Sequence, residues 1–122
     1  MALTNAQYDE IMRGYDKRQL QNKYIHDKRI EEAYRKAPRL REIDSEIASA
    51  SVRQAYRLMD GDENALAALR LAIDDYKEER AALLSTLGYS LDYFEPIYTC
   101  PDCHDTGYIN GQKCHCFKQA II

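Results

Sequence analysis

The chain of 122 residues carries 17 lysines and arginines against 20 aspartates and glutamates, a formal net charge of −3. Charges of both signs are mixed along it, so it lacks the one-signed field typical of nucleic-acid-binding domains. Hydrophobic residues make up 45% of the chain and prolines number only three, which excludes an intrinsically disordered protein.

The sequence shows no export signal or membrane-spanning segment. No stretch approaches the roughly 20 apolar residues that cross a bilayer, and the first residues lack a basic region followed by an apolar run. We therefore expect a cytoplasmic protein with no membrane partner. In a reducing cytoplasm, cysteines crowded between positions 100 and 116 indicate a metal site in preference to disulfides.

The first predicted helix runs from about Asn5 to Ala37. Thr4 and Gln7 form a capping-box pattern at its start, and the segment contains a single glycine and no proline. A polar middle breaks the apolar stripe, which argues against packing along the full length of one straight helix. The stripe comprises Tyr8, Ile11, Met12, Tyr15, Leu20, Tyr24, Ile30, Ala33 and Tyr34, and the break comprises Gln19, Gln21 and Asn22.

The second predicted helix begins at Pro38, because proline fits the first turn of a helix and not its interior. It ends at Asp60-Gly61-Asp62, where glycine can take the left-handed conformation. Its apolar positions recur with a helical period: Leu40, Ile43, Ile47, Ala50, Ala55 and Leu58.

The third predicted helix is capped by Asp62 and stops near Gly88. Its apolar residues step alternately by three and four, which is the seam of a coiled coil. Arg80 alone breaks that seam, and its long side chain can reach solvent by snorkelling. The seam comprises Leu66, Leu69, Ile73, Tyr76, Arg80, Leu83 and Leu87.

Short connections between long helices favour antiparallel neighbours. We therefore predict a mainly α fold, in which an antiparallel helical bundle or hairpin of about three helices occupies residues 1–95. A small zinc-ribbon-like element follows over residues 96–120. Residues 117–122 have the pattern of the start of another helix.

The metal site is predicted from the spacing Cys100-x2-Cys103-x10-Cys114-x-Cys116. Two close pairs at the ends of a short loop are what a tetrahedral cation needs, because each pair spans two corners. Asn110-Gly111 is a strong two-residue hairpin turn, so a small ribbon brings the second pair back to the first.

Other chemistries compete with zinc for these cysteines. Cys100-Pro-Asp-Cys103-His104 also matches the c-type haem motif, but haem attachment requires export and leaves Cys114 and Cys116 unused. A redox C-x-x-C would follow a βαβ pattern, and the C-x-C pair is tight for an iron–sulfur cluster. Zinc explains all four thiols best, although either His104 or His115 can replace one of them as a ligand.

No motif indicates catalysis. Phosphate-binding G-x-x-x-x-G-K-[ST] is absent, as are G-x-G-x-x-G, H-E-x-x-H and G-x-S-x-G. His26 and the acidic pairs Asp74-Asp75 and Glu78-Glu79 fit solvent-exposed helix faces. Four thiolates leave no open coordination position, so the zinc would be structural and this segment would not be an enzyme.

The tail of the chain resembles a known family. Residues 96–109, PIYTCPDCHDTGYI, and 113–122, KCHCFKQAII, are similar to the region before the ATPase domain of bacterial DnaI/DnaC-like helicase loaders. The resemblance implies a zinc-binding N-terminal part that engages the hexameric replicative helicase in DNA replication. In that family an AAA+ ATPase domain follows, which uses ATP and contacts single-stranded DNA. Residues 117–122 would lead toward such a domain, or the chain would be a stand-alone partner protein.

Two surfaces follow from these hypotheses. Tyr108, Ile109 and Phe117 are candidate contacts for the helicase, because a small ribbon cannot bury all three, and packing around the zinc or onto the bundle is an equally good interpretation of each. Alternatively the ribbon binds single-stranded DNA through Tyr108, Phe117, Lys113 and Lys118, or acts as a redox switch that releases zinc on oxidation.

Overall fold

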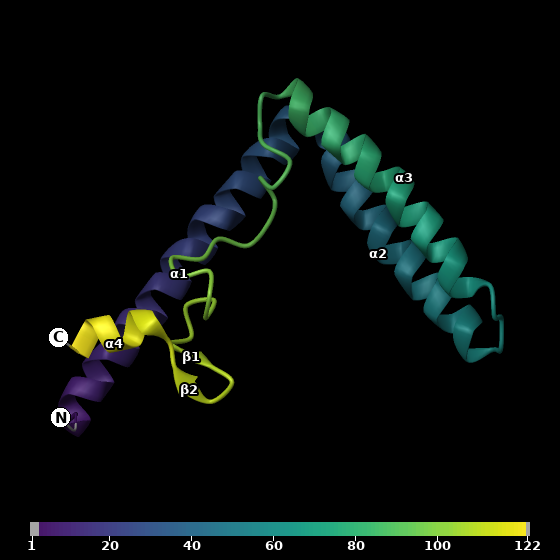
Figure 1. Cartoon of the computed structure of the whole chain (residues 1–122). Helices are drawn as coiled ribbons and strands as arrows, with labels where there is room; N and C mark the ends of the chain where they lie inside the picture. The colour runs from purple at the N-terminus through teal and green to yellow at the C-terminus, as the bar shows by residue number, and fades with distance from the viewer. Residues whose placement is uncertain (1–2, 122) are drawn as a thin grey trace. The chain divides into compact units, whose positions relative to one another are not determined.

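The computed structural model describes residues 3–121 and is mainly α-helical, as predicted (Figure 1). Four helices and a two-stranded sheet follow one another along the chain. None of the described helices is both long and apolar enough to cross a bilayer. The elements are α1 (Asn5–Lys36), α2 (Pro38–Met59), α3 (Ala65–Thr86), β1 (Tyr108–Ile109), β2 (Gln112–Lys113) and α4 (His115–Ile121).

The start of α1 has the predicted capping box. The Gln7 backbone N–H donates to Thr4 Oγ1 at 3.1 Å, and the Thr4 N–H donates to Gln7 Oε1 at 2.9 Å, so two unpaired amides are satisfied. The helix ends at Lys36, and Pro38 opens α2. The predicted boundary at Ala37–Pro38 is therefore confirmed.

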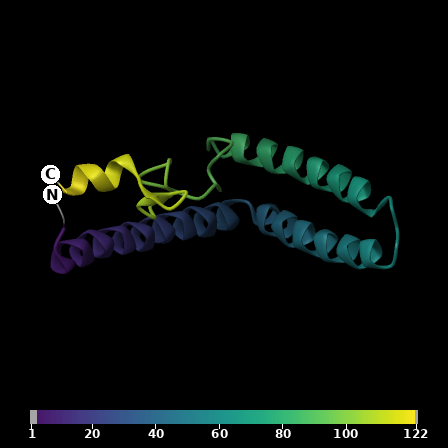
Figure 2. The same ribbon diagram turned by 60° about the horizontal axis from the view of Figure 1, so that its bottom comes forward.

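Helices α2 and α3 form an antiparallel hairpin (Figure 2). Gly61, with φ of +91°, ends α2 in the left-handed conformation, and Gly88, with φ of +80°, follows α3. The Tyr89 N–H donates to the Leu84 carbonyl at 2.9 Å and closes the last turn of α3. Asp62 does not cap α3 directly: its carboxylate accepts from the Asn64 N–H, and the helix begins one residue later.

The chain divides into two compact units. The first, which we call the cysteine unit, comprises residues 1–28 and 95–122, and the second, the hairpin unit, comprises residues 29–94. This differs from the predicted division near residue 95, because the first turns of α1 pack on the cysteine segment and its last turns pack on the hairpin. The polar break in the stripe of α1 lies in the cysteine unit.

The core of the hairpin unit is apolar. Ala33, Leu40 and Leu84 are fully buried, and aromatic residues from the segment after α3 cover them: Tyr89, Tyr93 and Phe94. The rings of Tyr89 and Tyr93 stack with centroids 4.1 Å apart. Burial of large side chains against one another supplies most of the stability of such a core.

Arg80 lies within the seam of α3 and does not snorkel to solvent. Its guanidinium pairs with Asp44 of α2, and the Tyr34 hydroxyl donates to the same carboxylate. Burial and the bond to Asp44 raise the pKa of Tyr34 to about 12. The polar residue in the seam therefore joins α1, α2 and α3.

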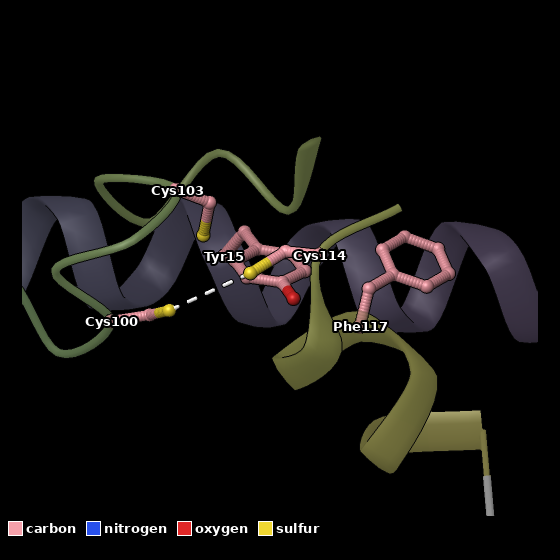
Figure 3. Close-up of a cluster of buried hydrophobic side chains, with 5 residues drawn as sticks. All are labelled: Tyr15, Cys100, Cys103, Cys114 and Phe117. Atoms are coloured by element: carbon pink, nitrogen blue, oxygen red, sulfur yellow. Dashed lines mark hydrogen bonds between the residues drawn. The ribbon is translucent and has the colours of Figure 1, made fainter. Parts of the chain in front are cut away.

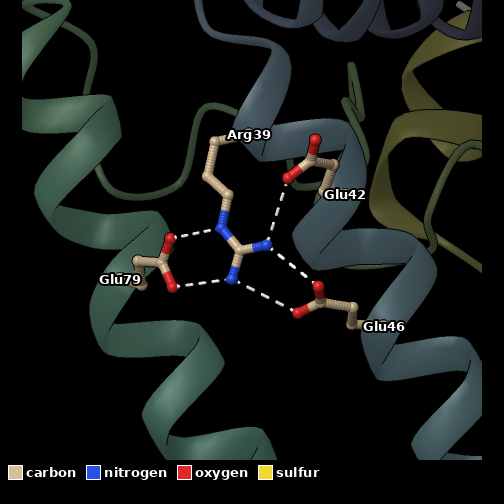
Figure 4. A network of polar contacts seen from close by, with 4 residues as sticks. All are labelled: Arg39, Glu42, Glu46 and Glu79. Carbon is tan, nitrogen blue, oxygen red and sulfur yellow. Dashed lines mark hydrogen bonds and ion pairs between the residues drawn. The ribbon is translucent and has the colours of Figure 1, made fainter.

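A second polar cluster joins α2 to α3 around Arg39 (Figure 4). Arg39 Nε lies 2.5 Å from Glu79 of α3, and its Nη1 lies 2.9 Å from Glu46 and 3.2 Å from Glu42 of α2. One guanidinium thus holds three carboxylates in fork geometry. All four side chains are partly exposed to water, so the cluster positions the helices more than it stabilises them.

Candidate metal centre

The four cysteines come from two separate pieces of chain and meet at one point. Cys100 and Cys103 lie in the turn before the sheet, Cys114 follows β2, and Cys116 lies in α4. All four sulfurs lie within 4.8 Å of one another, with Cys100 Sγ 3.8 Å from Cys114 Sγ and Cys103 Sγ 3.7 Å from Cys116 Sγ.

These separations suit a tetrahedral cation. Metal–sulfur bonds of about 2.3 Å place the sulfurs of a tetrahedron about 3.8 Å apart, whereas a disulfide needs about 2.05 Å. Cys100, Cys103 and Cys114 are buried and Cys116 is partly buried. The site can therefore hold a metal ion, and the four thiols fill every corner.

The predicted β-hairpin returns the second pair of cysteines. Tyr108 pairs with Lys113 and Ile109 with Gln112 in antiparallel register. Asn110 and Gly111, with φ of +52° and +80°, form the two-residue turn that the Asn-Gly sequence predicts. The Cys114 N–H then donates to the Gly107 carbonyl at 2.8 Å, which fixes Cys114 beside the first pair.

The two neighbouring histidines occupy different environments. His115 Nε2 lies 2.6 Å from Asp102 Oδ2 and 3.9 Å from Cys100 Sγ, so Cys100, Asp102 and His115 form a second, more exposed group of possible ligands. His104 instead stacks on Tyr98 with centroids 4.2 Å apart, and it belongs to neither group among residues 3–121. Of the two, His115 is the one placed near the sulfurs.

Asp105 organises the turn that carries the first cysteine pair. Its side chain is 1% exposed and accepts hydrogen bonds from the backbone amides of Thr99 at 2.9 Å and Cys100 at 2.8 Å. Asn22 of α1 donates to the same carboxylate, and Gln19 donates to the Asp105 carbonyl at 2.7 Å. A buried carboxylate is stable when several donors surround it in this way.

Sequence reasoning missed the role of Asp105, which it did not single out. The available signal was the polar break in the first helix, because Gln19 and Asn22 point to a polar partner on that face. Leu20 and Tyr24, counted as part of the apolar stripe, are 69% and 64% exposed. The middle of α1 therefore binds the cysteine segment through polar contacts.

An aromatic core lies behind the sulfurs (Figure 3). Tyr15 of α1 and Phe117 of α4 are buried, with ring centroids 6.0 Å apart. The Tyr15 hydroxyl lies 2.9 Å from Cys116 Sγ. Burial, and to a smaller extent this hydrogen bond, raises the pKa of Tyr15 above its usual range. Gly107, with φ of +85°, passes so close that a Cβ there would lie 2.8 Å from the Tyr15 ring.

The thiols differ in acidity when no cation is bound. Burial opposes ionisation of Cys103, but hydrogen bonds from the Gly107 amide and the neighbouring cysteines lower its pKa to about 7. Burial raises the pKa of Cys116 to about 12. A cation among the four sulfurs would favour the thiolate form of each, because its charge offsets the burial.

The structure corrects one of the predicted surface contacts, Phe117, and places Lys113 and Ile109 near the surface. Phe117 is fully buried against Tyr8, Tyr15 and Tyr108, because α4 turns its ring toward α1, so it is not a contact or stacking residue on the surface. Lys113 Nζ lies 5.2 Å from the centroid of that same ring. Ile109 is 40% exposed and remains available to a partner.

No protein-family model, no curated protein and no solved structure matches the chain. The fold and the site by themselves define a class: a helical protein in which four cysteines, beside a buried carboxylate and an aromatic core, lie close enough together to hold a metal ion.

Proposed function

We propose that the metal is zinc and that its role is structural. Four sulfur ligands in tetrahedral spacing suit zinc, and the closed ligand set leaves no position for substrate. The buried cysteines also form much of the core of their unit, together with Tyr15 and Phe117. The metal would thus replace the larger apolar core that so short a segment lacks.

Metal analysis of the purified protein tests this proposal. We expect one zinc per chain and no visible absorption from an iron–sulfur cluster. Cys114→Ser should lower the zinc content strongly, whereas His104→Ala, at a residue that stacks on Tyr98 outside the sulfur group, should leave it unchanged. Stoichiometric iron in place of zinc would overturn the assignment.

We further propose that this chain is a non-catalytic module that binds the hexameric replicative helicase, as the N-terminal part of a DnaI/DnaC-like loader. The observation that carries the proposal is the resemblance of residues 96–122 to the segment that precedes the ATPase domain in that family. A longer protein would then continue into an AAA+ ATPase domain that contacts single-stranded DNA.

The cysteine unit supports a docking role because it is a small, rigid element whose hairpin projects one apolar side chain. Ile109 lies in β1 beside the Asn110-Gly111 turn and is 40% exposed, while Tyr108 is half-buried and bonds to Tyr8 at 3.2 Å. A partner could cover Ile109 without any change in the metal site.

Calorimetric titration of the chain into the replicative helicase of the same organism tests the proposal. We expect association that Ile109→Ser weakens about tenfold, a loss of about 1.4 kcal/mol. Leu91→Ser is a control, since Leu91 is 72% exposed and lies in the hairpin unit. No association at about 100 μM of each protein would overturn the proposal.

A further inference from the structure

The outer face of α2 carries an exposed seam, with small serines at one end and large apolar side chains at the other, that nothing in the described chain covers. Ser45, Ser49, Val52, Tyr56 and Met59 follow one another at alternate steps of four and three, which places them on one face. All five are exposed, with Val52 at 56%, Tyr56 at 66% and Met59 at 81%. We call this set the outer seam of α2.

The outer seam is distinct from the face of α2 that packs within the hairpin unit. The buried residues of α2 are Leu40, Ile43 and Ala50, and they lie on the opposite side of the helix. The second half of the helix, at Val52, Tyr56 and Met59, therefore carries an additional apolar stripe. A surface helix that serves only its own hairpin needs one apolar stripe, so the second stripe points to a partner.

The outer seam tapers along the helix. Its small members, Ser45 and Ser49, lie toward Pro38, and its large members, Tyr56 and Met59, lie toward the Gly61 turn. Near the small end a shallow hollow opens on α2, lined by Arg41, Glu42, Ser45 and Glu46. A seam with knobs at one end and a hollow at the other fits a reversed copy of itself.

Charged residues are also unevenly distributed along α2. Residues 47–59 contain Arg53 and Arg57 and no acidic residue, whereas residues 38–46 contain Glu42, Asp44 and Glu46 together with Arg39 and Arg41. Within residues 3–121, the Arg53 side chain makes no ion pair or hydrogen bond. The Arg53 side chain of one helix therefore complements Glu46 of another that runs in the opposite direction.

We propose that α2 docks against α2 of a second copy of this chain, antiparallel and related by a two-fold axis near Ser49. Tyr56 enters the hollow beside Ser45 of the second copy, and the small Ser49 side chains let the two backbones approach. Arg53 pairs with Glu46 of the second copy. Such an interface is self-complementary, as a two-fold axis requires.

The carboxylate of Glu46 has room for this additional donor. It already accepts from Arg39 at 2.9 and 3.2 Å within its own chain (Figure 4), and a carboxylate offers about four acceptor positions. One helix on one helix lies at the small end of specific interfaces, below about 1,200 Å² in total. We therefore expect a dissociation constant of about 10–100 μM.

Sedimentation equilibrium of the full chain with its metal, from about 1 to about 500 μM, tests the dimer. Ser49→Glu places like charges at the axis and should weaken association at least about tenfold, while Ser49→Ala keeps the side chain small and should leave association within about twofold. Ser85→Glu is the control, because Ser85 is an exposed serine of α3 outside the outer seam. Unchanged helical circular dichroism verifies that each variant folds.

Arg53→Glu tests the orientation, because it would face Glu46 of the second copy and should weaken association several-fold at low salt. A chain that stays monomeric at about 500 μM would overturn the proposal. So would a dimer that Ser49→Glu and Ser85→Glu affect equally. Neither result concerns the helicase, so the failure of this proposal and the failure of the proposed function are distinguishable.

Discussion

Different interactions stabilise the interior of the cysteine unit and the interior of the hairpin unit. In the cysteine unit a buried carboxylate, four sulfurs and two stacked rings converge from segments far apart in the chain. In the hairpin unit neighbouring helices pack through aliphatic and aromatic residues, and the polar clusters at Arg39 and Arg80 join their sides. On the structural role proposed for the metal, the first unit would depend on a cation that the second does not need.

This contrast has a simple physical origin. The hairpin unit has enough apolar residues on adjacent helices to form a core by local packing. The segment from Glu95 onward is short and polar, so its few apolar side chains cannot offset the entropy of ordering its turns. A metal bound by the four cysteines would supply the missing free energy at one point.

Removal of the metal should have the largest effect and should separate the two units. When the cation is chelated, the turns that carry the buried thiols and Asp105 should unfold. We therefore expect the amides of residues 95–121 to exchange freely in hydrogen–deuterium exchange. The α2–α3 hairpin should keep its protection. Protection of Cys100 to Phe117 that survives complete chelation would contradict the structural role of the metal.

Gly107→Ala should destabilise the cysteine unit by about 3 kcal/mol. Alanine is unfavourable in the left-handed conformation, and its methyl group would overpack the core. The added Cβ would lie 2.8 Å from the Tyr15 ring and 3.1 Å from the Phe117 ring. Gly111→Ala is the matched control: its φ of +80° is also left-handed, but nothing lies within 4 Å, so we expect a cost of about 1 kcal/mol. Denaturant unfolding of the metal-loaded protein measures both, and equal costs would disprove the close approach.

Leu84→Ala should destabilise the hairpin unit by about 3 kcal/mol and leave the metal affinity unchanged. Leu84 is fully buried between the helices, so its loss leaves a cavity. Leu71→Ala, at a residue that is 70% exposed on the same helix, should cost less than about 0.5 kcal/mol. Similar midpoints of thermal unfolding for the two variants would argue against the described packing.

Asp105→Asn should cost about 2 kcal/mol in the cysteine unit, because an amide supplies one acceptor oxygen where three donors converge. The donors are the amides of Thr99 and Cys100 and the side chain of Asn22. Asp102→Asn, at a carboxylate that is 60% exposed, serves as the control and should be nearly neutral. The comparison is made by urea unfolding at full metal occupancy. If Asp105→Asn left the free energy of unfolding unchanged, Asp105 would not organise the turn as described.

Acid should produce the smallest effect, in the hairpin unit. Hydrogen bonds from Arg39 lower the pKa values of Glu46 and Glu79 below the ordinary 4.5. A carboxyl group whose pKa is lower in the folded state contributes stability above its unfolded pKa, and that contribution disappears as the pH falls through the folded pKa. We therefore expect the melting temperature of the hairpin unit to fall as the pH drops below about 4.5. The fall should be smaller in Arg39→Gln, which lacks these hydrogen bonds. An identical slope in both proteins would exclude these ion pairs as the cause.

Local features of the chain were predictable because neighbouring residues determine them. The capping box at Thr4, the break at Pro38, the turns at Gly61 and Asn110-Gly111 and the spacing of the cysteines each specify a short piece of backbone, and the structure contains all of them. The fold class follows from the same periodicity.

Only the tertiary structure decided which pieces meet. Gln19 and Asp105 are 86 residues apart in the chain, and no local pattern indicates that a polar break in a helix will receive a buried carboxylate. The same holds for Phe117, for which the sequence left surface contact and burial both open and which lies against Tyr15. The sequence alone determined the helices and the spacing of the four cysteines, whereas long-range packing determined that α1 would be divided between the cysteine unit and an apolar hairpin.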